Sequence, residues 1–247
     1  MNLKLGAVLA SLLVLGACEQ QDPADFDRRL RAYLLEHPEV IREAAIKLRQ
    51  ERAAQAAAVM KQAQPALEHD ARDFVANPGG RATVVQFFDY RCPYSRAIAP
   101  EVDRLIAQNP DVRFVFKQYP VFGSASDYAA RVALTPQGKA KGLELHRALM
   151  GQKDLNALRV DRIVGRLGLN PREVEQASRA PQIEAQIGDT RALAQEIHAT
   201  GTPTFVVAGE VIPGADAERL AAAISRARAQ ALSSILGDAL GKAPVAP

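Results

Sequence analysis

The feature that most constrains the fold of this chain is a buried-strand pattern that runs into a cysteine and a proline. Residues 82–88 are almost continuously apolar and β-prone, which is typical of a strand covered on both faces. Cys92-Pro93 follows, and Pro93 suits the first position of a helix because an N–H would have no partner there. Apolar residues then recur at helical spacing from Ile98 to Ile106, and residues 112–116 alternate as a second strand. This strand–helix–strand order predicts a parallel sheet and therefore an α/β fold.

The rest of the main domain is predicted to be a helical block followed by a hairpin. Residues 123–200 have helical patterning interrupted only by Pro- and Gly-containing turns. Two short strands are expected over 204–208 and 210–213, around Gly209, and a helix is expected from Ala215. The chain is therefore expected to form a small sheet with an all-helical insertion.

An N-terminal helical extension is expected over residues 24–78. The apolar stripe of its first helix lies at positions i, i+4, i+7 and i+8, which are Phe26, Leu30, Tyr33 and Leu34. Pro38 is placed to start a second helix that reaches Gln64. The stripe has no core of its own, so we expect it to pack on the main domain or on another subunit, as a homo-oligomer formed through residues 26–60.

Three further boundaries follow from proline and glycine. Pro65 is expected to open a third helical piece that carries Leu67, Phe74 and Val75 on one side. The turn at 77–80 ends that piece, so the main domain is expected to span residues 79–228. A peripheral C-terminal helical tail is expected over 229–247.

The first residues resemble an export signal. Lys4 precedes an apolar stretch over 7–15, and residues 1–17 have the layout of a signal peptide. The sequence Leu-Gly-Ala-Cys that ends at Cys18 resembles the lipobox of bacterial lipoproteins, which implies cleavage before Cys18 and its acylation. Residues 18–23 would then be anchor and linker, with the protein held in the bacterial cell envelope and facing the periplasm. An ordinary secretory signal, with Cys18 incidental, is the alternative.

The cysteine count narrows the chemistry. The chain has two cysteines, so acylation of Cys18 leaves Cys92 as the single thiol. A lone thiol in an exported protein is a reactive group, an intermolecular partner or a relic. In a Cys-x-x-Cys turn the second thiol resolves a mixed disulfide formed by the first. Here Ser95 occupies the second position, so the turn can bind a partner thiol covalently but cannot release it unaided.

Composition and motif searches exclude several other function classes. The net charge of +3, from 31 basic and 28 acidic side chains, gives no reason to expect nucleic-acid binding. No apolar run is long enough for a retained membrane-spanning helix. The sequence has no Cys/His spacing for zinc, no glycine-rich phosphate loop and no Gly-x-Ser-x-Gly elbow, so neither a metal nor a cofactor is expected. Ser95 also has no evident base that would make it a hydrolytic nucleophile.

Five segments in a fixed order carry a resemblance to a known family; they are residues 33–40, 87–93, 116–120, 146–150 and 200–206. Together they resemble the DsbA-like thiol–disulfide oxidoreductases, in particular the subgroup with an N-terminal helical extension. The resemblance implies a thioredoxin-like α/β fold with an all-helical insertion. The chain departs from the family at Ser95, where the family has its second cysteine.

The resemblance also implies a site. Cys92, Pro93, Tyr94 and Ser95 match the active turn, and Thr202-Pro203 matches a loop that faces the cysteine with a cis proline. A cis bond would present the backbone of Thr202 to a client strand, while a trans turn stays open as the alternative. The helix start is expected to favour the Cys92 thiolate, with the Ser95 hydroxyl donating to the sulfur and lowering its pKa.

Neighbouring polar residues have competing interpretations. Asp89 and Lys117 are candidates for a proton-handling pair, a structural ion pair or solvated side chains. Arg91 and Arg96 either add positive charge near the sulfur or point to solvent. His146 is expected to pack within the insertion or lie on its surface rather than act as a base.

The leading hypothesis is a membrane-anchored, monothiol thiol–disulfide exchange protein, similar to an isomerase or a thiol transferase. Its expected partners are client proteins with disulfides or free thiols, together with a dithiol reductase or a small thiol. Three alternatives stay open: a redox-inactive peptide-binding or chaperone-like module, a trap whose Cys92 becomes sulfenylated or glutathionylated, and an engineered Cys-to-Ser form of a dithiol enzyme.

Overall fold

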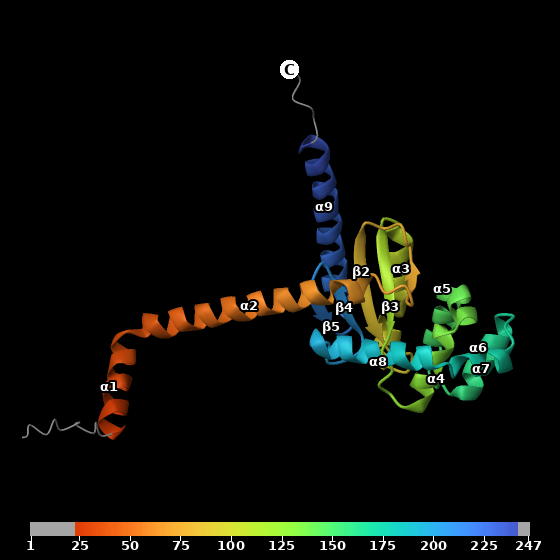
Figure 1. Ribbon diagram of the computed structural model, residues 1–247, viewed down its shortest axis with the longest axis horizontal. Helices are drawn as coiled ribbons and strands as arrows, with labels where there is room; N and C mark the ends of the chain where they lie inside the picture. Colours follow the sequence, from red (N-terminus) through yellow and green to blue (C-terminus); the bar gives the residue numbers. More distant parts are fainter. Residues whose placement is uncertain (1–22, 242–247) are drawn as a thin grey trace, which may run out of the picture. The chain divides into compact units, whose positions relative to one another are not determined.

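The computed structural model describes residues 23–241 and the side chains of residues 23–236 (Figure 1). The predicted signal peptide 1–17, the lipidation site Cys18 and most of the predicted linker lie outside these residues. The chain separates into two compact units, residues 1–53 and 54–247. Within the described part, no helix combines the length and apolarity needed to cross a membrane.

The described part of the first unit is helical. Helix α1 spans Pro23–Glu36 and helix α2 spans Pro38–Glu68, so the predicted break at His37-Pro38 is confirmed. Helix α1 has no buried residue. The exposed apolar side chains of the two helices are Phe26, Leu30, Tyr33, Leu35, Val40, Ile41, Ile46 and Leu48.

The second unit is built on a five-stranded sheet of order β1-β3-β2-β4-β5. These strands are Phe74–Ala76, Ala82–Phe88, Val112–Gln118, Thr204–Val207 and Glu210–Pro213 for β1 to β5. Strands β2 and β3 are parallel, while β1 and the β4–β5 hairpin pair antiparallel. The predicted strand–helix–strand unit and the hairpin around Gly209 are therefore confirmed. Strand β2 lies at the centre of the sheet, which explains why its sequence is almost continuously apolar.

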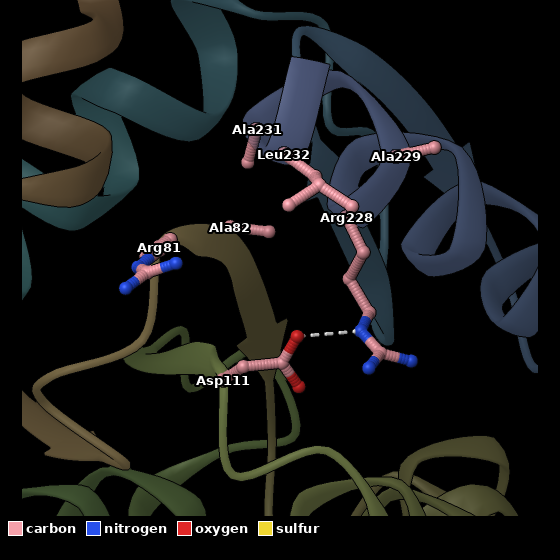
Figure 2. Close-up of a pocket in the computed structure, with 7 residues that line it drawn as sticks. All are labelled: Arg81, Ala82, Asp111, Arg228, Ala229, Ala231 and Leu232. Atoms are coloured by element: carbon pink, nitrogen blue, oxygen red, sulfur yellow. Dashed lines mark hydrogen bonds and ion pairs between the residues drawn. The ribbon is translucent and has the colours of Figure 1, made fainter. Parts of the chain in front are cut away.

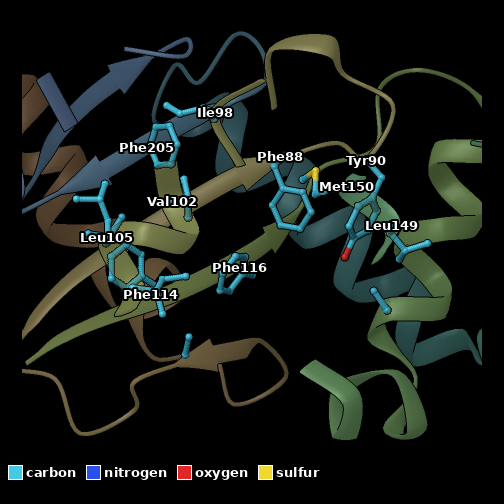
Figure 3. Packing of buried hydrophobic residues seen from close by; sticks show 14 of the residues in the cluster. Phe88, Tyr90, Ile98, Val102, Leu105, Phe114, Phe116, Leu149, Met150 and Phe205 are labelled. Atoms are coloured by element: carbon cyan, nitrogen blue, oxygen red, sulfur yellow. The ribbon is translucent and has the colours of Figure 1, made fainter. Parts of the chain in front are cut away.

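Helices cover both faces of this sheet. Helix α3 (Pro93–Gln108) and helix α9 (Ala217–Gly241) cover the face that bears Phe88, Phe114, Phe116 and Phe205. Figure 3 shows Phe205 and Phe114 beside Ile98, Val102 and Leu105 of α3, and Phe88 next to Tyr90 and Met150. The end of α2 and helix α8 (Pro181–Glu196) cover the opposite face, around Val85 and Phe87. The sheet therefore forms the middle of three layers.

The predicted all-helical insertion is confirmed. It consists of α4 (Ser124–Leu134), α5 (Pro136–Met150), α6 (Ala157–Arg166), α7 (Pro171–Ser178) and α8. Helices α4 to α7 gather beside the sheet in Figure 1. Prolines occupy the first positions of α5, α7 and α8, and Thr135, Asn156 and Asn170 cap helix starts through their side-chain oxygens.

The predicted third helical piece from Pro65 is wrong. Pro65 lies inside the last turn of α2, which continues to Glu68. Phe74 and Val75 belong to β1, where Phe74 is opposite Phe116 of β3 and packs against its ring. A strand of three residues is too short to show a period in the sequence, so pairing with β3 decides its conformation.

Candidate functional site

The active turn lies where central strand β2 passes into helix α3. Cys92 has extended backbone angles and caps the helix, and Pro93 takes its first position. The Cys92 N–H donates to the Asp89 carbonyl at 3.1 Å, and the Arg96 N–H donates to the Cys92 carbonyl at 3.1 Å. The N–H groups of Tyr94 and Ser95 have no carbonyl partner within the helix, so they face its start. The turn therefore places the sulfur at the positive end of a helix dipole.

The sulfur of Cys92 is covered in this structure. Cys92 is 1% exposed, and its thiol donates to the carbonyl oxygen of Thr202 at 3.0 Å. The Thr202–Pro203 peptide bond is cis, which settles the alternative that the sequence left open. The structure therefore brings together the two parts of the predicted site, the Cys92 turn and the Thr202-Pro203 loop, which are 110 residues apart.

Ser95 is fully buried one turn into α3. Among the described residues its hydroxyl has no hydrogen-bond partner, so the expected donation to the Cys92 sulfur is not formed here. The hydroxyl of Thr202 and the side-chain amide of Gln86, on β2, are also buried without partners in the described part. Tyr94, by contrast, is 67% exposed. Of the four residues in the turn, only Pro93 and Tyr94 present large surfaces to solvent.

Asp89 organises the active turn, a role that the sequence analysis missed. Its buried carboxylate accepts from the N–H of Arg91 at 2.6 Å and from the hydroxyl of Ser126 at 2.7 Å. It also accepts from the N–H groups of Val121 and Phe122 at 2.6 and 3.0 Å. The bond to the residue two positions on is an Asx turn, and the aspartate directly after an apolar strand was its signal in the sequence. This one carboxylate therefore joins the turn to the loop after β3.

Arg91 and Arg96 are held by backbone carbonyls rather than facing freely into solvent. Arg91 donates to the carbonyl of Phe122 at 2.6 Å. Arg96 donates to the carbonyls of Gln152 and Lys153 at 2.8 and 2.6 Å. Both side chains therefore fasten neighbouring loops to the active turn.

Asp89 and Lys117 do not pair with each other, so the alternative of a proton-handling pair is excluded, while Lys117 does form a structural ion pair. Lys117 is buried and forms an ion pair with Asp73, while its ammonium also donates to the carbonyl of Ala66 at 2.5 Å. Gln186 donates to the other oxygen of Asp73 at 3.1 Å. Burial raises the pKa of the Asp73 carboxyl, and the Lys117 ammonium offsets part of that rise. This network joins α2, β3 and α8 to the start of β1.

His146 is a packing residue, as predicted. Its buried ring contacts the rings of Phe88, Tyr90 and Phe116. Burial lowers the pKa of His146 to about 3, with a smaller contribution from Arg147, so the imidazole is neutral near neutral pH. Burial likewise raises the pKa of Tyr90, whose phenol oxygen accepts from Gln118 at 3.2 Å. Both side chains are therefore uncharged near neutral pH.

The cavities of the second unit are lined by other residues. One cavity of about 280 Å³ lies between the start of β2, Asp111 and helix α9, where Arg228 pairs with Asp111 at 2.7 Å (Figure 2). Another, of about 360 Å³, is lined by Gln152 and three arginines of α6. In residues 23–241 no group of three or more His, Cys, Asp and Glu side chains is arranged to hold a metal ion.

Most of the chain matches known protein families. Residues 83–225, more than half of its length, match the DSBA-like thioredoxin domain. Residues 22–55 match the N-terminal domain of the copper resistance protein ScsC.

Solved structures give the same fold. A thioredoxin-like oxidoreductase from Silicibacter pomeroyi is 40% identical, with a TM-score of 0.63, over 66% of this chain and 96% of that one. BcfH from Salmonella enterica Typhimurium is 32% identical, with a TM-score of 0.63, over 83% of this chain and 95% of that one. A periplasmic thioredoxin-like protein from the same serovar is 27% identical, with a TM-score of 0.62, over 67% of this chain and 95% of that one.

One sequence relative is much longer than this chain. The Na(+)/H(+) antiporter NhaA 3 of Salinispora tropica is 29% identical over 175 residues, which cover 65% of this chain. The match spans 25% of that protein.

Proposed function

We propose a function for this chain from one premise: the chain belongs to the family of DsbA-like thioredoxin domains. The proposed function is thiol–disulfide exchange on exported proteins, with Cys92 as the reacting group and no second thiol in the turn. The observation that carries it is the position of Cys92, which caps α3 and lies 3.0 Å from the backbone of Thr202. A helix start stabilises the thiolate, which is the nucleophile in exchange.

The exchange proceeds in two balanced steps. The Cys92 thiolate attacks one sulfur of a client disulfide, which forms a mixed disulfide and releases the other client sulfur as a thiolate. A different thiol of the client then attacks the client sulfur of the mixed disulfide. A client disulfide is formed and the Cys92 thiolate is regenerated, so no net oxidation occurs and the client is isomerised. If a small thiol instead attacks the Cys92 sulfur, the client leaves with both of its thiols, and a second small thiol frees Cys92 by forming the disulfide of the small thiol.

Residues around the sulfur are proposed to hold the client. A client strand would pair with the backbone of Thr202 and lie beside Pro203. Tyr94, Val121 and Phe122 are exposed apolar side chains on the two loops that Asp89 joins, and they would contact the client's side chains. Ser95 would leave the mixed disulfide intact until a thiol from outside the turn attacks it.

We also propose an exported and oligomeric form. The signal-like segment 1–17 and the lipobox-like sequence at Cys18 support a lipid anchor, and the likeness to a periplasmic thioredoxin-like protein supports the periplasm. The match of residues 22–55 to a separate family domain, together with the exposed apolar residues of α1 and α2, supports association through the extension. Several Cys92 sites would then share one client.

Exchange at Cys92 is tested by reactivation of a client with scrambled disulfides. Cys92→Ala is expected to abolish reactivation, because it removes the thiol that is proposed to attack the client at the Thr202 loop. Cys18→Ser removes the other cysteine and is the matched control, with reactivation expected to remain. Full activity in Cys92→Ala would overturn the proposal.

Burial of the thiol favours a second candidate function, the redox-inactive peptide-binding module. A sulfur that is 1% exposed must be uncovered before it reacts. Under this alternative, peptides bind to the Thr202 loop, binding is unchanged in Cys92→Ala, and reactivation is absent from the wild-type protein as well.

A further inference from the structure

Helix α6 carries its charges and its apolar residues on separate faces. Val160, Ile163 and Val164 are buried against the rest of the insertion. Arg159, Arg162 and Arg166 follow the spacing i, i+3 and i+7, which places them along one side of the helix. With Gln152 they line the cavity of about 360 Å³, here named the arginine cavity.

The positive charge of the arginine cavity is poorly compensated. Within the described residues, Arg162 and Arg166 form no ion pair with a carboxylate. Arg159 lies 3.9 Å from Asp154, a highly exposed side chain that screens it weakly. Elsewhere in the insertion, four arginines are paired with acidic side chains and Arg172, among the described residues, is not; the pairs are Arg131 with Asp127 and Glu184, Arg147 with Asp103, Arg179 with Glu175, and Arg191 with Asp127. The cavity therefore has guanidinium groups free to bind an anion.

The arginine cavity is connected to the active turn. Arg96 lies one helical turn after Cys92, and its N–H bonds the Cys92 carbonyl. The guanidinium of Arg96 donates to the carbonyl of Gln152, which lines the cavity, and to the carbonyl of Lys153. One side chain therefore links the start of α3 to the segment that forms one wall of the cavity.

We propose that the arginine cavity binds carboxylate side chains of an acidic client segment that flanks the cysteine attacked by Cys92. The inference rests on the proposed function, because it names the class of client that the same site prefers. Guanidinium groups match carboxylates in bidentate geometry, and several on one helix face suit more than one acidic residue. An extended strand advances about 3.3 Å per residue, so residues close to the client cysteine can lie at the active turn and at the cavity together.

The test uses three short peptides that differ only in the residues around one cysteine, which are aspartates, asparagines or lysines. Each peptide is presented to the whole protein as its mixed disulfide with thiopyridine, and the second-order rate of transfer to Cys92 is measured. The aspartate peptide is expected to react about five- to tenfold faster than the asparagine peptide at low salt, with the advantage shrinking as salt is added. Arg162→Gln/Arg166→Gln is expected to remove this advantage.

Arg172→Gln/Arg179→Gln is the matched control, because it removes the same charge outside the cavity, from helix α7 and from the residue that follows it. A preference that survives in Arg162→Gln/Arg166→Gln, or that falls equally in the control, would overturn the inference. Equal rates for the three peptides with the wild-type protein would overturn it as well.

A binding measurement separates the inference from the proposed function. A fluorescent aspartate peptide with serine in place of its cysteine is titrated with the same three proteins, and its anisotropy is followed. Binding that is weakened only in Arg162→Gln/Arg166→Gln supports the arginine cavity even if Cys92 transfers no disulfide. Rapid transfer from all three peptides without a charge preference supports the exchange function and rejects the cavity.

Discussion

The hydroxyl of Ser95 occupies the position from which a second thiol would act, and it bonds to no described group. Replacing it with a thiol therefore loses no hydrogen bond. Ser95→Cys is expected to form a disulfide with Cys92 under mild oxidation and to release client peptides that stay bound to the wild-type protein. Thiol titration and the lifetime of the mixed disulfide measure the two effects.

Ser95→Ala is the control for that substitution. It removes an unpartnered buried hydroxyl, so the free energy of unfolding is expected to change by less than about 1 kcal/mol. The mixed disulfide is expected to be as long-lived as in the wild-type protein. Rapid release of the client from Ser95→Ala would contradict this prediction, because it would show that the mixed disulfide is resolved without a thiol at position 95.

His146 makes the stability of the domain depend on pH. Its pKa is about 3 in the folded protein and about 6.5 in the unfolded chain, so unfolded chains take up the proton first as the pH falls. The contribution to stability is complete above about pH 6.5 and is lost at about 1.4 kcal/mol per pH unit below it. His146→Phe keeps a ring in the aromatic cluster, and it is expected to lose about 2–3 kcal/mol less than the wild-type protein between about pH 7 and pH 4.5.

Urea unfolding at both pH values measures this difference. His69→Gln is the control, because it removes an exposed imidazole in place of a buried one. An identical pH dependence in His146→Phe would contradict the assignment of the buried, neutral imidazole.

The sequence predicted which residues meet at the candidate site better than it predicted their contacts. Cys92, Pro93 and the Thr202-Pro203 loop were identified from local motifs, and the structure brings them together. The covered state of the sulfur depends on a carbonyl 110 residues away, which no local pattern encodes. The partner of Lys117 could not be predicted for the same reason, because Asp73 reaches it only since β1 and β3 are neighbours in the sheet.

At the level of helices and strands, the prediction was correct where an apolar pattern extended over enough residues to identify the element. The nearly continuous apolar run of β2 and the apolar stripe of α3 identified both elements, and tertiary packing agrees with them. Strand β1 was not predicted because its conformation depends on pairing with β3. The predicted helix boundary at Pro65 was wrong because a proline near a helix end need not end the helix. Local propensity gave way to pairing at the edge of the sheet.

The buried pair Lys117–Asp73 holds several of these elements together. Lys117→Met leaves a buried carboxyl without its cation, so the free energy of unfolding is expected to fall by about 3–5 kcal/mol. Lys117→Met/Asp73→Asn also removes the carboxylate but keeps an oxygen for Gln186, so it is expected to recover part of that loss. Urea unfolding of the two variants measures the recovery.

The exposed ion pair of Arg147 and Asp103 is the control for this prediction. Arg147→Met is expected to cost less than about 1 kcal/mol, because water screens the pair. A double variant that is less stable than Lys117→Met would contradict the view that the unpaired buried charge is the main cost.

For the whole molecule, the question is what covers the apolar residues of α1 and α2. If other subunits do, Leu30→Glu/Ile41→Glu is expected to convert an oligomer to a monomer in light scattering. The variant should keep the reactivity of Cys92 toward a small thiol and lose most of its reactivation of clients with several disulfides. Gln50→Glu/Gln55→Glu adds the same charge at polar positions of α2 and should change neither property. A wild-type protein that is monomeric would contradict the prediction.

The hydrogen bond from Cys92 to Thr202 has a consequence for selectivity. In the resting protein, the carbonyl that a client strand would use already accepts the protein's own thiol. A client backbone N–H is a stronger donor than a thiol, so docking of the strand would favour its displacement. Recognition and unmasking of the nucleophile would then be a single event, and a molecule that cannot form a strand at Thr202 would meet a concealed sulfur. Such a protein discriminates by the shape of its partner before any chemistry begins.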